Sequence, residues 1–231
     1  DIALIKKASP KALIVNSANN PTGTVYTKNV MDRLIECVNV TGCWLLSDET
    51  YALLDYTESF FSALNYKLDR VVILSSLSKI FSIPGYRLGY QVSNSNEFNQ
   101  LTTKFLSTTI SCTPEFIQLG CADYLSEPAL AENAVRQARD LYKQQRDKIF
   151  SNNRWLSGKV PMPDAAFYLF IPVNKDGQKF AIDLISENRV AVTPGISFGK
   201  DFGSYIRLSF CGDLRDVNRG VEAIYEKFCA P

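Results

Sequence analysis

The sequence contains no histidine among its 231 residues. Catalysis of the Ser-His-Asp and Cys-His types, H-E-x-x-H zinc sites and any histidine general base are therefore excluded. If the protein is an enzyme, lysine, tyrosine, aspartate, glutamate or cysteine side chains must carry out its proton transfers. This absence limits the possible chemistry more than any other feature of the composition.

A large net charge, a long apolar run and a C-x-x-C pair are also absent. The 25 basic and 24 acidic residues give a net charge of +1, which favours neither nucleic acid nor an anionic membrane as a partner. No apolar run approaches the ~20 residues of a membrane span. Without C-x-x-C pairs, no metal site is expected, and free, mostly buried thiols in a reducing, cytoplasmic compartment are predicted.

The first residues lack the apolar region of a secretion signal. They also lack an initiator methionine and begin as if in the middle of a helix, so we expect a partial chain.

Short apolar segments alternate with a helical pattern in the first half of the chain. Between the first two segments, apolar residues at helical spacing follow Thr27, a predicted N-cap, and Gly42 ends the predicted helix. Polar residues gather after the expected strand ends. This order predicts an α/β fold with a parallel or mixed sheet, in which ligands bind at the carboxyl ends of the strands. The expected strands cover residues 12–15, 43–46, 71–74 and 88–92.

The second half of the chain reads as a smaller α+β unit that follows several helices. Its long helix, which begins near Pro128, is polar on much of its surface, as expected of a helix that joins two domains. We predict a division into residues 1–126 and residues 127–231. The expected helices cover residues 96–107, 114 onwards, 128–150, 179–187 and 213–228, and the expected strands 167–171, 190–193 and 205–210.

The stretch Ser75–Tyr90, SSLSKIFSIPGYRLGY, combines hydroxyls, one lysine, a Pro-Gly bend and an arginine directly after an expected strand. Such a composition is typical of a covalent or phosphate-handling site. Its S-x-x-K pattern also occurs in penicillin-recognising serine enzymes, but their S-D-N and K-T-G elements are missing here. Residues 195–201 resemble a phosphate-binding loop, but one residue too few separates the glycines, and a turn is the better interpretation.

Several side chains of the first half fit one type of site together. Lys79 can form a Schiff base with an aldehyde, and Asp48 can pair with a pyridinium nitrogen. Tyr51 and Asn20 can bind a phenolic oxygen. A phosphate could be held by Ser76, Ser78 and Arg87. These are the groups that a pyridoxal 5'-phosphate site requires, because the cofactor supplies the carbanion chemistry and the protein supplies orientation and charge.

Four motifs in order carry a resemblance to a known family. They are N-N-P-T-G (19–23), S-D-E-x-Y (47–51), S-x-S-K-x-x-x-x-P-G-x-R-x-G (76–89) and R-L-S-F (207–210). Together they resemble fold-type I aminotransferases of class I/II, over essentially the whole chain. The resemblance implies a mixed, mostly parallel sheet belonging to part of the large pyridoxal-phosphate-transferase domain, followed by the small domain. It also implies transamination between an amino acid and a 2-oxo acid, and a homodimer.

The resemblance assigns a role to each matching residue. Lys79 would form the Schiff base and then move the proton between the substrate Cα and the cofactor's C4′. Asp48 would keep the pyridine nitrogen protonated, and Asn20 and Tyr51 would bind the ring hydroxyl. Arg207, together with Asn20, would bind the substrate α-carboxylate. The phosphate would be bound by Ser76, Ser78 and Arg87.

The chain departs from the family pattern in two places. Family members are longer at the N-terminus, and the part without a counterpart here includes a glycine-rich phosphate turn, a ring that stacks on the pyridine and residues that cross a dimer interface. Residues 164–166 stand where the family often has glycines, which predicts a narrower pocket on that side. Residues 167–170 and 193–198 resemble segments near the substrate side chain, and Glu49 and Thr50 are expected to be structural.

Two alternatives remain open on the sequence. The same residues would serve elimination, cyclisation or decarboxylation on the same scaffold, because the bond held perpendicular to the ring decides which bond breaks. A non-catalytic, aminotransferase-like ligand-binding domain would also keep this fold. No second carboxylate-binding arginine is identified, so a dicarboxylic substrate is not indicated.

Overall fold

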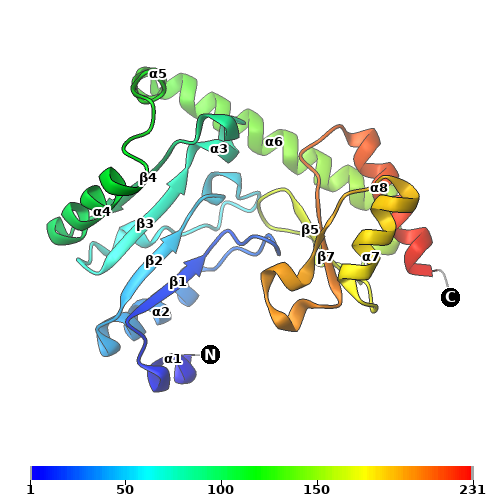
Figure 1. Ribbon diagram of the computed structural model, residues 1–231, viewed down its shortest axis with the longest axis horizontal. Coiled ribbons are helices and arrows are strands. Elements are labelled where there is room, and N and C mark those ends of the chain that lie inside the picture. The colour runs from blue at the N-terminus through cyan, green and yellow to red at the C-terminus, as the bar shows by residue number, and fades with distance from the viewer. Residues whose placement is uncertain (1, 230–231) are drawn as a thin grey trace. The chain divides into compact units, whose positions relative to one another are not determined.

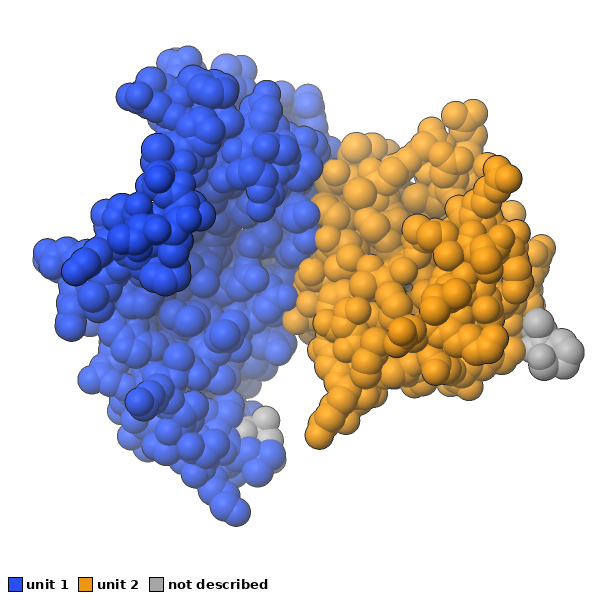
Figure 2. Space-filling view, viewed as in Figure 1, with its two compact units in different colours: residues 1–18, 25–139 blue, residues 19–24, 140–231 orange. Residues whose placement is uncertain are grey.

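The computed structural model describes residues 2–229, which fall into two compact units. Unit 1 consists of residues 1–18 and 25–139, and unit 2 of residues 19–24 and 140–231 (Figure 2). The long helix α6 (Pro128–Asn152) contributes residues to both units. The division after residue 126 stays a prediction, and the extreme ends of the two predicted ranges lie outside the described residues.

Unit 1 is built on a four-stranded sheet whose strands follow one another in chain order (Figure 1). Strands β1 (Ala12–Asn16), β2 (Trp44–Asp48) and β3 (Val71–Ser76) are parallel, and β4 (Gly89–Ser93) is antiparallel to β3. The prediction of a mixed, mostly parallel sheet is confirmed. Each predicted strand lies within about two residues of an observed one. Since β2 and β3 run in the same direction, their carboxyl ends lie at the same edge of the sheet.

Helix α2 (Lys28–Thr41) follows β1 and packs its apolar side into the core of unit 1. Met31, Leu34 and Val38 are buried together with Leu45 of β2. The helix ends as predicted at Gly42, which adopts a left-handed conformation with φ of 67° and donates its N–H to the Val38 carbonyl. Thr27 is at the N-cap position, but the predicted side-chain hydrogen bond is not made.

Of the other helices that lie wholly in unit 1, three contain no buried residue, whereas the short helix after β3 buries Leu77, Ser78 and Ile80. α1 (Ile2–Ala8) precedes the sheet, α3 (Leu77–Ile80) follows β3 directly, and α4 (Asn96–Thr109) and α5 (Glu115–Leu125) follow β4. Neither α4 nor α5 contains a buried residue, although both carry large apolar side chains. In the described part of the chain, no helix is both long and apolar enough to cross a membrane.

Unit 2 contains a three-stranded antiparallel sheet in the order β5-β7-β6. Its strands are β5 (Tyr168–Pro172), β6 (Thr193–Pro194) and β7 (Tyr205–Ser209), and its helices besides the end of α6 are α7 (Gly177–Asp183) and α8 (Leu214–Cys229). Fully buried apolar side chains from the sheet and from α6 and α8 form the core; they include Ile149, Leu169, Ile171, Ile206 and Ile224. The α+β arrangement predicted for this part is confirmed.

Two predicted elements of unit 2 differ from the structure. The strand expected at residues 190–193 is reduced to Thr193–Pro194, because the Val190 N–H donates to Leu184 at the end of the preceding helix. The helix expected at residues 179–187 is α-helical only to Asp183 and continues as a π-helical turn, Leu184–Asn188. The six cysteines are free as predicted, but only Cys37 and Cys43 are buried.

Gly23 holds the loop of residues 19–24 against residues 163–165 of unit 2. It has φ of 71°, and a Cβ there would lie 2.4 Å from the Pro163 Cβ and 2.7 Å from the Ala165 carbonyl oxygen. A hydrogen bond joins the two segments at this point, because the Ala165 N–H donates to the Gly23 carbonyl at 2.9 Å. Only glycine fits both this conformation and this spacing.

We expect Gly23→Ala to lower the free energy of unfolding by about 2–4 kcal/mol, since left-handed strain and overpacking add. Gly158→Ala is the matched control. Gly158 is also left-handed, with φ of 83°, but no atom lies within 4 Å of a Cβ added there. We therefore expect Gly158→Ala to lower the free energy of unfolding by only about 1 kcal/mol. Urea unfolding of the two variants measures the difference, and equal losses would contradict the role of close packing at Gly23.

Candidate active site

Asp48 is the last residue of β2, and its carboxylate is held by the turn that follows. Its Oδ1 accepts the Thr50 backbone N–H at 3.1 Å, a local bond that fixes the side-chain rotamer. The side chain is half-buried, and the structure records no donor for its second carboxylate oxygen within residues 2–229. Tyr51, three residues on, is buried with 4% of its surface exposed. A fixed carboxylate with one available oxygen can accept a hydrogen bond from a protonated ring nitrogen.

Glu49 is a buried carboxylate next to Asp48, and it anchors the loop that leads to β3. Its Oε1 accepts from the Ser47 hydroxyl at 3.0 Å and the Ala63 N–H at 2.9 Å, and its Oε2 accepts from the Ser62 hydroxyl at 2.7 Å. Burial raises the pKa of the Glu49 carboxyl, and these three hydrogen bonds oppose the rise. These contacts are consistent with the structural role expected of Glu49. The periodicity of the sequence does not predict the contacts themselves.

We expect Glu49→Gln to change how the stability of the protein depends on pH. Because the folded-state pKa of Glu49 is raised, its contribution to stability is fully present below the unfolded-state pKa and is lost as pH rises through the folded-state pKa. Glutamine does not titrate, so the free energy of unfolding of the variant should improve relative to the parent as pH rises from about 4 towards 7. Urea titrations across this range measure the difference, and parallel curves would contradict it.

Lys79 lies in the short helix α3, which begins directly after β3. Ser76 caps this helix, because its Oγ accepts the Ser78 backbone N–H at 3.1 Å. Ser78 is buried and Lys79 is half-buried. Among residues 2–229, Lys79 Nζ has neither a carboxylate partner nor a hydrogen-bond acceptor. A half-buried amine without a partner is available for covalent chemistry.

Arg87 approaches the same edge of the sheet from the strand that runs in the opposite direction. It precedes β4, whose first residue, Gly89, pairs with Ser76 at the end of β3. A Cβ on Gly89 would lie 2.8 Å from the Ser75 carbonyl oxygen, so glycine lets the two strands close up at this point. Arg87 itself is exposed and donates from Nη1 to the Pro84 carbonyl at 2.8 Å. The structure therefore brings Ser76, Ser78, Lys79 and Arg87 together with the end of β2.

The donor set at this edge fits pyridoxal 5'-phosphate. The unpaired Lys79 amine can react with the aldehyde, and the Asp48 carboxylate has an oxygen for the pyridine nitrogen. Two hydroxyls and one guanidinium can bind a phosphate group through charge-assisted hydrogen bonds. These residues carry the chemical groups that the aldehyde, the pyridine nitrogen and the phosphate of the cofactor require. The individual roles stay predictions.

Arg207 and Asn20 meet in unit 2, although they are 187 positions apart in the sequence. Arg207 lies on β7, and its Nη1 donates to the Asn20 Oδ1 at 2.8 Å. Its Nη2 donates to the Thr193 hydroxyl at 3.1 Å. The Arg207 side chain is half-buried, and its Nε is a buried atom that has no hydrogen-bond partner among residues 2–229. The sequence placed residues 193–198, which include Thr193, near the substrate side chain. It did not predict the hydrogen bond between Thr193 and Arg207.

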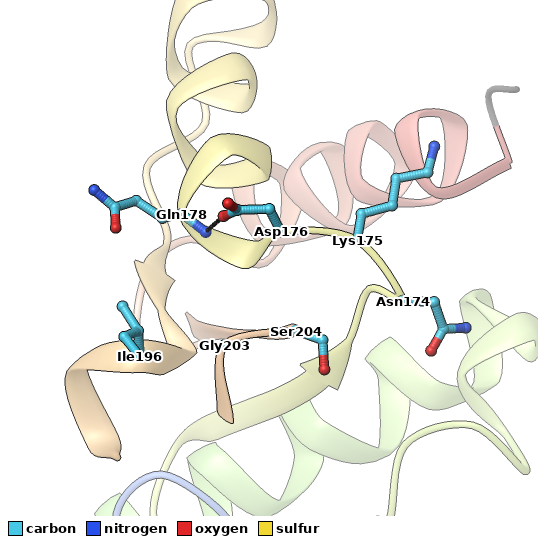
Figure 3. A pocket seen from close by; sticks show the side chains of 7 residues that line it. All are labelled: Asn174, Lys175, Asp176, Gln178, Ile196, Gly203 and Ser204. Atoms are coloured by element: carbon cyan, nitrogen blue, oxygen red, sulfur yellow. Dashed lines mark hydrogen bonds between the residues drawn. The ribbon is translucent and has the colours of Figure 1, made fainter. Parts of the chain in front are cut away.

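A surface hollow of about 540 Å³ in unit 2 contains none of the predicted site residues (Figure 3). Asp176 lies directly before α7, and its carboxylate accepts the Gln178 N–H at 2.9 Å (Figure 3). The hollow is therefore lined in part by a helix cap. Its lining consists of Asn174, Lys175, Asp176, Gln178, Ile196, Gly203 and Ser204.

Comparison with known proteins identifies the family. The family model described as "Aminotransferase class I and II" matches residues 2–224. The chain belongs to this family, whose members use pyridoxal 5'-phosphate. Membership of this family, which the four motifs predicted, is confirmed.

Individual relatives share about a third of the sequence. The aspartate aminotransferase of Thermococcus kodakarensis is 32% identical over 231 residues, which cover 99% of this chain and 60% of that protein. The aspartate aminotransferase of Thermotoga maritima is 32% identical over 216 residues, covering 93% of this chain and 55% of that protein. The chain thus spans 55–60% of the length of these relatives.

Solved structures agree on the fold. A mutant of Thermus thermophilus aspartate aminotransferase superposes with a TM-score of 0.90 at 27% identity, covering 98% of this chain and 60% of that one. The aromatic aminotransferase of Pyrococcus horikoshii gives a TM-score of 0.88 at 27% identity, with coverage of 98% and 62%. The α/β fold of aminotransferases is therefore shared by the chain.

Proposed function

We propose that the protein carrying this chain catalyses transamination between an amino acid and a 2-oxo acid, with Lys79 binding pyridoxal 5'-phosphate as a Schiff base. The observation that carries this proposal is the unpaired, half-buried Lys79 amine at the carboxyl edge of the sheet. Membership of an aminotransferase family supports it, and the relatives named above are aminotransferases.

When bound, the cofactor supplies an electron sink for the bond broken at the substrate Cα. Lys79 would hold the cofactor through its aldehyde, and its amine would move the proton between the substrate Cα and the cofactor's C4′. Asp48 keeps a proton on the pyridine nitrogen through a charge-assisted hydrogen bond. Tyr51 and Asn20 donate to the ring oxygen.

The residues around the start of α3 bind the phosphate group of the cofactor. Ser76 and Ser78 offer hydroxyl donors, and Arg87 offers a planar cation. Arg207 and Asn20 bind the α-carboxylate of the substrate, and the bond between them holds both groups in one orientation.

The test combines cofactor binding with product analysis. The purified protein should take up pyridoxal 5'-phosphate, show a visible absorption band that borohydride removes, and then carry the reduced cofactor on the peptide with Lys79. Incubation with an amino acid and a 2-oxo acid should yield the exchanged pair. Release of ammonia or of a leaving group instead would contradict transamination while keeping the cofactor, and a protein that binds no cofactor would contradict both.

We also propose that the protein is a cytoplasmic homodimer. The six free cysteines support a reducing compartment. Large apolar side chains exposed on α4 and α5, including Phe105, Phe116 and Leu119, support an interface with a second copy. Sedimentation equilibrium tests the dimer, and a monomer at micromolar concentration would contradict it.

A further inference from the structure

Arg207 is a half-buried cation that no carboxylate of the described residues neutralises. Its two hydrogen bonds go to neutral acceptors, the Asn20 side-chain amide and the Thr193 hydroxyl. Burying a charge without a counter-ion is costly unless other groups stabilise it. Other groups in unit 2 must therefore stabilise the charge of this guanidinium.

Two aromatic rings lie against the Arg207 guanidinium. Its Cζ is 4.3 Å from the centroid of the Tyr168 ring and 5.0 Å from that of Phe198. Both distances are within the range of cation–π attraction, in which the negative face of the ring stabilises the cation. Tyr168 is buried and Phe198 is half-buried, so water screens these contacts little.

The register of the sheet explains why Tyr168 and Thr193 reach Arg207. Strands β5 and β7 lie side by side (Figure 1), with Phe170 opposite Arg207. Tyr168 is two residues before Phe170, so it lies on the same face as Arg207 and diagonal to it. Thr193 of β6 is directly opposite Arg207 on the other side. Phe198 ends the turn Gly195–Phe198 that follows β6.

The rings leave the hydrogen-bonding edge of Arg207 available. A guanidinium has five N–H groups. Asn20 and Thr193 accept one from each terminal nitrogen, and the Nε–H is buried. One N–H on Nη1 and one on Nη2 therefore remain for a ligand. A protein carboxylate in place of the rings would compete for these donors and would cancel the positive charge.

We propose that Tyr168 and Phe198 are positioning residues that replace a counter-ion for Arg207, fixing its guanidinium while keeping it charged and open to a carboxylate ligand. The proposal rests on the proposed function of Arg207 as the α-carboxylate site. The rings touch the arginine and act on the substrate only through it.

The test measures binding of a simple monocarboxylate, butanoate, to the cofactor-loaded protein by calorimetry, and steady-state kinetics with several amino acids. Tyr168→Leu and Phe198→Leu should each weaken butanoate binding about fivefold and raise KM by a similar factor for every substrate. The kcat should change less than twofold. Tyr168→Phe keeps the ring and should restore binding.

Tyr205→Leu is the matched control. Tyr205 is also a strand residue of this aromatic cluster, where its ring centroid lies 4.8 Å from that of Phe170, and within the described residues its ring makes no recorded cation–π contact with Arg207. This variant should bind butanoate like the parent. A fall in affinity equal to that of Tyr168→Leu would show a general loss of packing and overturn the proposal.

Arg207→Ala separates the two hypotheses. If it abolishes butanoate binding while both leucine variants bind normally, the aromatic rings have no positioning role and only the present inference fails. If Arg207→Ala binds butanoate like the parent, the carboxylate site assigned in the proposed function fails, and the inference falls with it. Thermal unfolding of each variant shows that the compared proteins are folded.

Discussion

Lys79→Ala is expected to abolish transamination, with a rate loss of at least about 10⁴-fold. A positioned general base alone contributes about 10²–10⁴-fold, and this substitution also removes the nucleophile that attaches the cofactor. The amine of Lys79 comes from the short helix α3, which Ser76 caps at the end of β3. The measurement is single-turnover formation of the 2-oxo acid, with borohydride reduction and peptide mass to follow covalent attachment.

Two variants make the result specific to the amine. Lys79→Arg keeps the positive charge but cannot form a Schiff base, and it should be as inactive as alanine. Lys143→Ala removes an exposed lysine from helix α6 and should leave the rate unchanged. Reduced cofactor on a lysine other than Lys79 in the parent would refute the assignment.

Arg207→Ala is expected to raise KM for amino acids and 2-oxo acids by about 10²–10⁴-fold. Hydrogen bonds to charged groups contribute about 1.5–3 kcal/mol each, and the two N–H groups that remain on the terminal nitrogens of Arg207 would both be lost. Misplacing the substrate should also lower kcat, because the carboxylate contact orients the Cα–H bond. Steady-state kinetics with two amino acids of different side chains measure the change.

The matched control for Arg207 is Arg215→Ala. Arg215 is exposed and pairs only with the neighbouring Asp213 within the described residues, so its loss should leave KM within twofold of the parent. Arg207→Lys keeps the charge but loses the planar fork, and we expect it to recover only part of the affinity. If Arg207→Ala changed KM no more than Arg215→Ala does, the α-carboxylate would have to bind elsewhere.

Local sequence signals predicted the elements that carry the site in unit 1. The apolar runs gave the strands, and Gly42 ended α2 in the left-handed conformation that glycine favours. The S-x-S-K motif placed Lys79 directly after β3. These signals are local, because a strand, a cap or a turn depends mainly on neighbouring residues.

Two predictions failed although the residue types favoured them. Residues 190–192 are apolar and β-favouring, but the Val190 N–H closes the end of the preceding helix instead of joining the sheet. Thr27 has the residue type of an N-cap and the right position, but its side chain makes no capping bond. For Val190 the hydrogen-bond partner, not the residue type, decided the conformation.

The sequence by itself determined the chemistry available to this protein: no histidine, one lysine in a strand-to-helix turn, and an arginine in R-L-S-F. Only the tertiary structure decided which neutral groups surround that arginine. Asn20, Thr193, Tyr168 and Phe198 reach Arg207 through strand register and loop packing. The physical reason is that residue patterns encode local periodicity, whereas contacts between distant residues depend on how the whole chain packs.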